Sequence, residues 1–110
     1  MNERISEEVS REERVRPPVH PGRVLELEFL GPLEMSAYHL AGAIGVMPPR
    51  VYEIVRGERA VSADTALRLG RYFGTGPEFW LNLQSHHDLE IARDRVGEKI
   101  EREIRPLSPA

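Results

Sequence analysis

The sequence predicts an all-α protein organised around a helix-turn-helix. Two short runs with apolar residues at helical spacing meet at a glycine turn between Ser36 and Gly57. Serine, glycine and proline recur where further helices begin and end, as at Ser62 and Gly74. These observations indicate short helices joined by tight turns.

Residues 1–18 are predicted to form a mobile N-terminal arm or a frayed helix. Charged and small polar residues dominate this segment, and Pro17 and Pro18 interrupt any helix that precedes them. Its five glutamates suit a basic protein partner better than the minor groove of DNA.

A first helix is predicted to begin at His20 and to end at Gly31 and Pro32. Pro21 suits its first turn, because an amide hydrogen there would have no partner. The apolar side of this helix comprises Val24, Leu25, Leu27, Phe29 and Leu30. His20 is expected to be a capping or packing residue.

The stretch from Ser36 to Gly57 is the centre of the prediction. Ser36 suits an N-cap, because a serine hydroxyl accepts a hydrogen bond from a free amide of the first turn. Four core positions match the helix-turn-helix pattern: Ala41, Gly45, Val51 and Ile54. A small residue allows a close helix crossing, the glycine adopts a positive φ, and two branched side chains fix the angle between the helices. An αα-hairpin in a helical bundle is the alternative, but it does not require all four positions.

The second helix of this pair is predicted to be a recognition helix. Pro48 or Pro49 suits its first turn. The side away from its apolar stripe carries the expected base contacts, namely Pro49, Arg50, Tyr52, Glu53 and Arg56. Arginine donates to guanine or phosphate, glutamate accepts from cytosine, and tyrosine lies against a methyl group or a sugar. Each residue alone is ordinary surface, and their shared face favours DNA binding.

The turn after the recognition helix brings Arg59 close to the end of that helix, and Ser62 caps a further helix through Tyr72. This helix is expected to pack inward through Ala66, Leu67, Leu69, Tyr72 and Phe73. The expected phosphate contacts are Ser36, Tyr38, Arg59, Ser62 and Thr65. Simple exposure of Tyr38 and a plain capped helix at Ser62 are the open alternatives.

A helix starting at Gly76 and Pro77 closes the core with Phe79, Trp80, Leu81 and Leu83 and completes a domain over residues 19–85. Residues 86–105 form a separate amphipathic helix in this prediction, and residues 106–110 a tail. Its narrow apolar stripe comprises Leu89, Ala92, Val96, Ile100 and Ile104. We expect this stripe to contact a second copy or another protein, with packing on its own domain as the alternative.

Composition excludes several functions. The chain has no cysteine, so disulfides and thiolate metal sites are absent, and no apolar run approaches a membrane span. His86, His87 and Asp88 are adjacent and cannot easily converge on one metal ion, so we expect no metal, no cofactor and no enzyme activity. The absence of a signal-like segment predicts a cytoplasmic protein.

Net charge also limits the mode of DNA binding. The whole chain carries −3, whereas residues 35–75 carry five arginines against three acidic groups. Binding is therefore expected to depend on a few placed contacts, doubled by dimerisation, rather than on a broad basic surface.

The chain resembles the HigA family of antitoxins, which are helix-turn-helix proteins of the xenobiotic-response-element type. The resemblance spans about 65 contiguous residues and is carried by HPG (His20 to Gly22), RVYEIVRGERAVSADTALRLGRYFGT (Arg50 to Thr75) and PEFWLNLQ (Pro77 to Gln84). It continues more loosely into DLEIAR (Asp88 to Arg93). Family members commonly have glutamine where this chain has Ala37, so we expect phosphate contacts to shift to Ser36, Tyr38 and Arg59.

The resemblance implies a five-helix, lambda-repressor-like domain that forms a homodimer and binds double-stranded DNA at a palindromic operator in its own promoter. It also implies neutralisation of a HigB-type toxin, a RelE-like mRNA endonuclease, within a type II toxin-antitoxin system. Two alternatives remain: a free-standing transcriptional repressor without a toxin, and a protein-interaction module that has lost DNA binding.

Overall fold

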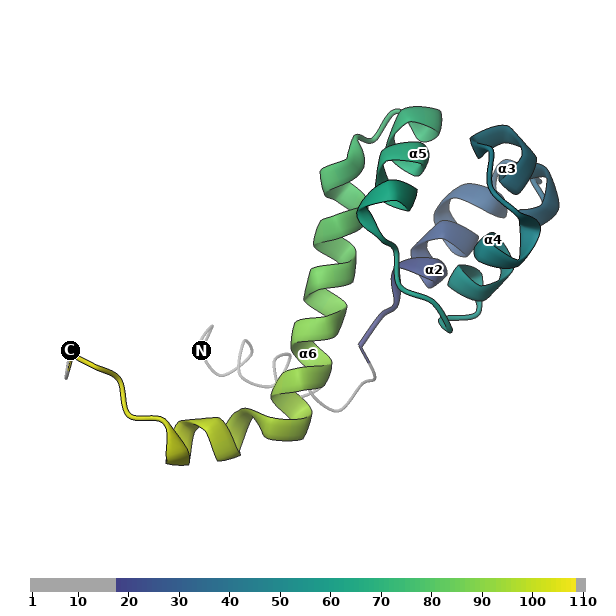
Figure 1. The fold of residues 1–110 in the computed structure, drawn as a ribbon. Coiled ribbons are helices and arrows are strands. Elements are labelled where there is room, and N and C mark those ends of the chain that lie inside the picture. Colours follow the sequence, from purple (N-terminus) through teal and green to yellow (C-terminus); the bar gives the residue numbers. More distant parts are fainter. Residues whose placement is uncertain (1–17, 109–110) are drawn as a thin grey trace, which may run out of the picture.

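The computed structural model describes residues 18–108, and these form five helical segments without a strand. The segments are α2 (Pro21–Val24) with its continuation η1 (Leu25–Leu30), then α3 (Ala37–Ile44), α4 (Pro48–Val55), α5 (Ala63–Phe73) and α6 (Pro77–Glu103). Figure 1 shows α2 to α5 gathered at one end of α6, which projects away from them. The predicted all-α, five-helix architecture is confirmed. The predicted arm, apart from Pro18, and the last two residues of the tail lie outside the described residues.

The helix ends follow the local chemistry of the sequence. The Ser36 hydroxyl accepts a hydrogen bond from the His39 amide at 3.0 Å, and Ser62 caps α5 by accepting from the Thr65 amide at 3.2 Å. At the other end, α3 stops at Gly45, whose φ is +74°. Glycine adopts this left-handed conformation without the steric cost of a Cβ atom, so the chain turns directly into α4.

One apolar core joins all five segments. Its fully buried members are Leu25, Leu30, Leu40, Ala41, Ile44, Val51, Ile54, Val61, Ala66, Leu69 and Trp80. Trp80 enters from α6 and packs against Phe29 of η1, with ring centroids 5.1 Å apart. The Trp80 indole nitrogen donates to the Thr75 hydroxyl at 2.9 Å, so the one polar atom of this side chain is satisfied.

Four residues that the sequence assigns to the core are exposed instead, and Phe79 of α6 is one of them, at 38% exposure. Leu27 is 55% exposed because η1 winds as a π-helix, in which the Gly31 amide bonds the Glu26 carbonyl five residues back. This winding aligns Leu25 with Leu30 and turns Leu27 outward. Leu67 is 61% exposed and Tyr72 41% exposed, because α5 buries the side that carries Ala66 and Leu69.

One helix crosses the predicted boundary between residues 85 and 86. Helix α6 runs without interruption from Pro77 to Glu103, because neither proline nor glycine occurs between Pro77 and Gly97. The predicted C-terminal extension is therefore the second half of the helix that closes the core. Figure 1 shows that its last turns run at an angle to the first ones.

Candidate nucleic-acid interface

Helices α3 and α4 form a helix-turn-helix held by four positions. Ala41 is fully buried, and Val51 and Ile54 are 2% and 1% exposed. Gly45 turns the chain, and the Val46 amide donates to the Ala41 carbonyl at 3.0 Å. This packing fixes α4 relative to α3, so the outer face of α4 has a defined orientation.

The outer face of α4 presents all five of the expected base-contact residues to solvent to some degree. Pro49, Tyr52 and Arg56 are exposed, whereas Arg50 and Glu53 are partly buried. Arg56 lies at the C-cap of α4. The face thus combines hydrogen-bond donors, one acceptor and one aromatic ring on a rigid helix, the chemistry needed to discriminate base edges in a major groove.

Each arginine of this surface is held by a nearby carboxylate. Arg50 pairs with Asp64 at 2.9 Å, Arg59 with Glu53 at 2.8 Å, and Arg56 with Glu58 at 3.1 Å. These exposed pairs contribute little to stability. They do restrict where each guanidinium lies before any ligand arrives.

Four of the five expected phosphate-contact residues lie on the surface, and one does not. Ser36, Tyr38, Arg59 and Ser62 are exposed, with Tyr38 at 68%. Thr65 is only 2% exposed, and its hydroxyl accepts a hydrogen bond from the Ser62 hydroxyl at 3.2 Å. Its side chain thus belongs to the packed face of α5 and not to the surface on which the other four lie.

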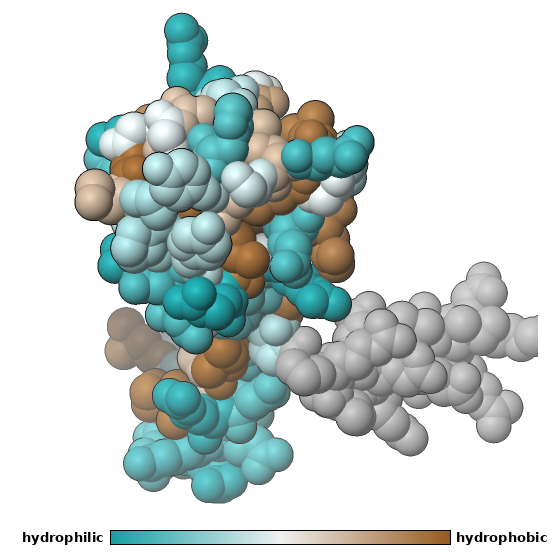
Figure 2. All heavy atoms as spheres, turned by 90° about the vertical axis from the view of Figure 1, so that its right-hand side faces the viewer, coloured by the Kyte–Doolittle hydropathy of each residue, from teal (hydrophilic) through white to brown (hydrophobic). Residues whose placement is uncertain are grey.

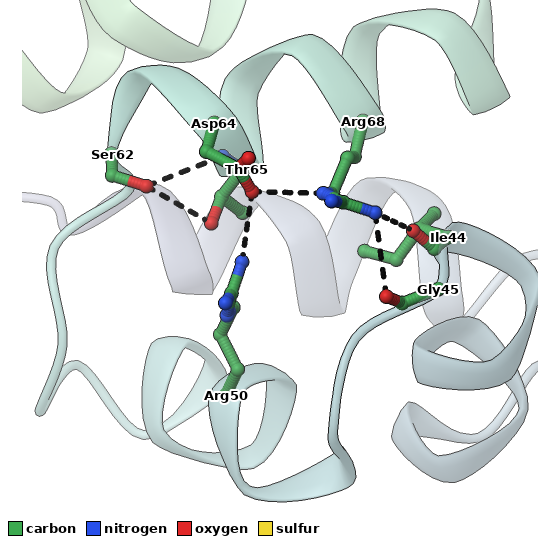
Figure 3. A network of polar contacts seen from close by, with 7 residues as sticks. All are labelled: Ile44, Gly45, Arg50, Ser62, Asp64, Thr65 and Arg68. Carbon is green, nitrogen blue, oxygen red and sulfur yellow. Dashed lines mark hydrogen bonds and ion pairs between the residues drawn. The ribbon is translucent and has the colours of Figure 1, made fainter.

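A polar network joins the turn of the helix-turn-helix to α5 (Figure 3). Arg68 of α5 donates to the Ile44 and Gly45 carbonyls at 2.8 and 3.3 Å and to the Asp64 carboxylate at 2.8 Å. Hydrogen bonds from Arg68 and Arg50 hold the pKa of Asp64 below its ordinary value, so this carboxylate is ionised. The sequence shows Asp64 and Arg68 at helical i,i+4 spacing, but their contacts with the turn and with α4 require the fold.

His20 is the N-cap of α2, where its Nδ1 accepts a hydrogen bond from the Gly22 amide at 2.9 Å. Burial lowers the pKa of His20, and the neighbouring His87 lowers it further. The neutral form is needed for the cap, since a protonated Nδ1 has no lone pair. His20 therefore has the structural role expected of it. The described residues contain no group of three acidic or histidine side chains able to hold a metal ion.

Gln84 is a buried polar residue that the sequence patterns did not single out. It lies on α6 at 7% exposure, and its side-chain oxygen accepts from the Val61 amide at 2.7 Å. Its nitrogen donates to Asp88 at 2.9 Å. Its position within an apolar helical stretch is the sequence feature that could have indicated a buried polar role. This residue attaches the chain that follows the recognition helix to α6.

The apolar stripe on the second half of α6 is exposed in the single chain. Ala92 is exposed, and Leu89, Val96, Ile100 and Ile104 are 49%, 39%, 46% and 64% exposed. Figure 2 shows brown apolar groups interrupting the hydrophilic lower part of the molecule, which α6 forms. Packing of this stripe on its own domain is absent from the described residues. No helix within residues 18–108 is long and apolar enough to cross a membrane.

Comparison with known proteins identifies the family. Virulence-associated protein I of Dichelobacter nodosus is 51% identical over 69% of this chain and 70% of its own length. Antitoxin HigA-1 of Vibrio cholerae is 37% identical over 84% of this chain and 86% of its own length. No protein-family model matches the chain.

The fold has close counterparts among solved structures. Antitoxin HigA of Pseudomonas aeruginosa, whose structure was determined with the higBA promoter, superimposes with a TM-score of 0.80. That protein is 49% identical, and the match covers 83% of this chain and 99% of the other. Antitoxins of this kind are not enzymes, which agrees with the expected lack of catalysis. The chain belongs to the HigA family of helix-turn-helix antitoxins.

Proposed function

We propose that this chain is the antitoxin of a type II toxin-antitoxin module and acts in the cytoplasm as a homodimeric repressor of its own promoter. The observation that carries the DNA-binding part is the outer face of α4 and the turn after it, where Arg50, Arg56 and Arg59 lie within the one segment of positive net charge. The Pseudomonas relative that was solved with a promoter supports the same role. Neutralisation of a HigB-type, RelE-like mRNA endonuclease completes the proposal.

The proposed mechanism uses α4 as the recognition helix. Its base contacts are Pro49, Arg50, Tyr52, Glu53 and Arg56, and the phosphate contacts are Ser36, Tyr38, Arg59 and Ser62. A two-fold dimer presents two such helices to successive major grooves, about 34 Å apart, and so matches a palindromic operator. Occupation of the operator excludes polymerase from the promoter.

Replacing Arg56 with alanine is expected to weaken operator binding by about 1 to 3 kcal/mol, because a contact to a base or phosphate is lost. Fluorescence anisotropy of a labelled duplex from the chain's own upstream region, titrated beside a scrambled duplex over a salt series, measures this effect. The unmodified chain should prefer the upstream duplex and bind it more tightly as salt falls.

Arg102→Ala is the matched control. Arg102 is also an exposed arginine paired with a glutamate, at 3.9 Å from Glu98, but it lies on α6, on the side away from the apolar stripe. Its replacement removes the same charge and should leave the preference for the upstream duplex unchanged. Equal weak binding of both duplexes by the unmodified chain, with no effect of Arg56→Ala, would contradict the proposed DNA binding.

The exposed stripe of α6 is the proposed protein-contact surface, for the second copy of the chain or for the toxin. An exposed apolar row flanked by charged side chains suits a partner helix or groove. Ile100 lies between Val96 and Ile104 in the C-terminal half of this stripe and is 46% exposed.

Ile100→Asp is expected to weaken whichever assembly this stripe forms by roughly tenfold or more, because burying an unpaired carboxylate is costly. Sedimentation of the chain alone, and with the product of a small basic reading frame on the same transcript, separates dimer from toxin binding. Arg95→Asp, on the same helix outside the stripe, is the control. Unchanged assembly in both experiments would exclude the stripe, and the lack of any toxin complex would favour a free-standing repressor.

A further inference from the structure

Arg68 connects three parts of the interface through one guanidinium group. Its Nη1 donates to the carbonyls of Ile44 and Gly45 at the C-terminal end of α3, and its Nε donates to Asp64 (Figure 3). Carbonyls at a helix end lack partners within the helix and carry partial negative charge, so an arginine there is favourable. A Cβ atom at Gly45 would come within 3.2 Å of this Nη1. The contact therefore fixes Arg68 closely against the turn.

Asp64 extends this connection to the recognition helix. The same carboxylate oxygen that accepts from Arg68 also accepts from Nη1 of Arg50, at 2.9 Å. Among the ion pairs of residues 18–108, Asp64 is the one carboxylate that binds two arginines. Glu53 and Glu58 each hold a single arginine and have no such anchor. Arg50 is thus connected to the backbone of the turn through the side chains of Asp64 and Arg68.

We propose that Asp64 and Arg68 are positioning residues for base recognition, with Arg68 anchoring Asp64 and Asp64 orienting the guanidinium of Arg50 toward a guanine. The inference rests on the proposed operator binding. One N–H of Arg50 is used by Asp64, and the remaining donors of its planar fork stay available for the two acceptors of a guanine edge. Arg50 is the third residue of α4, in the part of a recognition helix that reaches base edges.

A second consequence of the same contacts is electrostatic. Two guanidinium groups surround one ionised carboxylate, so the cluster keeps a net positive charge next to the DNA backbone. Were Asp64 only a restraint that withholds Arg50 from DNA, removing it would strengthen binding to every duplex equally. Orientation therefore predicts a loss of specificity when Asp64 is removed, whereas restraint predicts no change in specificity.

Asp64→Ala tests the proposal in the full-length chain, with the dissociation constants of the upstream and scrambled duplexes as the readout. We expect the ratio of the scrambled-duplex constant to the upstream-duplex constant to fall by roughly tenfold, while binding to the scrambled duplex is unchanged or tighter. In an Arg50→Ala background the same replacement should not change the ratio further, because the side chain that Asp64 orients is gone. Glu78→Ala is the control, since Glu78 is the acidic residue in the first turn of α6 as Asp64 is in α5.

Arg68→Lys provides an independent test that keeps the charge. A single ammonium group cannot reproduce the guanidinium bonds to both the carboxylate and the carbonyls, so the ratio should fall with the affinity for scrambled DNA unchanged. Melting temperatures confirm that each variant is folded during the titrations. An unchanged ratio in Asp64→Ala or in Arg68→Lys, with the preference of the unmodified chain intact, would overturn the inference alone. Loss of any preference in the unmodified chain would overturn the proposed function and this inference with it.

Discussion

Replacing Gly22 with alanine is expected to destabilise the protein by roughly 3 kcal/mol or more, because the new methyl group has no space. A Cβ atom at this position would lie 1.7 Å from the Ile54 carbonyl oxygen and 2.6 Å from its carbon. These are backbone atoms of the recognition helix, so they cannot move aside as a flexible side chain would. Helix α2 would have to separate from α4, and the orientation of the proposed DNA-binding face would change with it.

Gly42→Ala is the matched control for this prediction. Gly42 lies within α3, and a Cβ atom there meets nothing within 4 Å. Alanine at this site should stabilise the protein by about 0.5 to 1 kcal/mol, since glycine is the poorer helix former. Urea unfolding followed by the fluorescence of Trp80, the only tryptophan, measures both variants. Equal unfolding midpoints for the two would show that α2 and α4 are not in close contact.

Local chemistry explains why much of the fold was predictable. The caps at Ser36 and Ser62 and the left-handed turn at Gly45 depend on one residue and its immediate neighbours. The spacing of Ala41, Val51 and Ile54 is a constraint across a short turn, and the three side chains are buried as it requires. Such features carry their own structural consequences and need no knowledge of the remaining chain.

Choices between two possible faces of a helix were not predictable in this way. In α5, the apolar residues Leu67 and Tyr72 were expected to pack inward with Leu69, whereas the fold buries the face that carries Thr65 and Leu69. Which face lies inward depends on where α6 and α3 lie, information that no local window contains. The polar Thr65 enters the core because its hydroxyl finds a partner in the Ser62 cap.

The candidate interface likewise has a part that local sequence predicts and a part that depends on the packed fold. Its arginines can be located on α4 from helical geometry alone. The contacts of Arg50 and Arg68 cannot, because the Arg50 to Asp64 pair joins residues fourteen positions apart and the Arg68 bond to the Ile44 carbonyl spans twenty-four. Contacts of this range exist only once the helices have packed. They determine which donors of α4 remain free for the proposed contacts with DNA.

Trp80→Ala is expected to destabilise the protein by about 3 to 5 kcal/mol, through lost burial and the cavity that remains. Trp80 is completely buried, and its ring lies 5.1 Å from Phe29 and 6.3 Å from Phe73. One side chain thus connects α6 with η1 and α5. A loss of this size is a large part of the 5 to 15 kcal/mol, roughly, that separates a typical folded domain from its unfolded state.

Phe79→Ala distinguishes this effect from the general loss of an aromatic ring on α6. Phe79 is the neighbour of Trp80 in the chain and contacts its ring at 5.0 Å, but it is 38% exposed. Its replacement should cost much less, because solvent fills the vacated space and no closed cavity forms. Urea unfolding followed by circular dichroism measures both variants, since the fluorescent side chain is absent from one. If the two lost equal stability, α6 would be docked by its exposed aromatic edge rather than by the buried indole. A loss confined to Trp80→Ala means that α6 is part of the shared core through its buried indole. The helix with the proposed partner surface then unfolds together with the helices that carry the proposed DNA face.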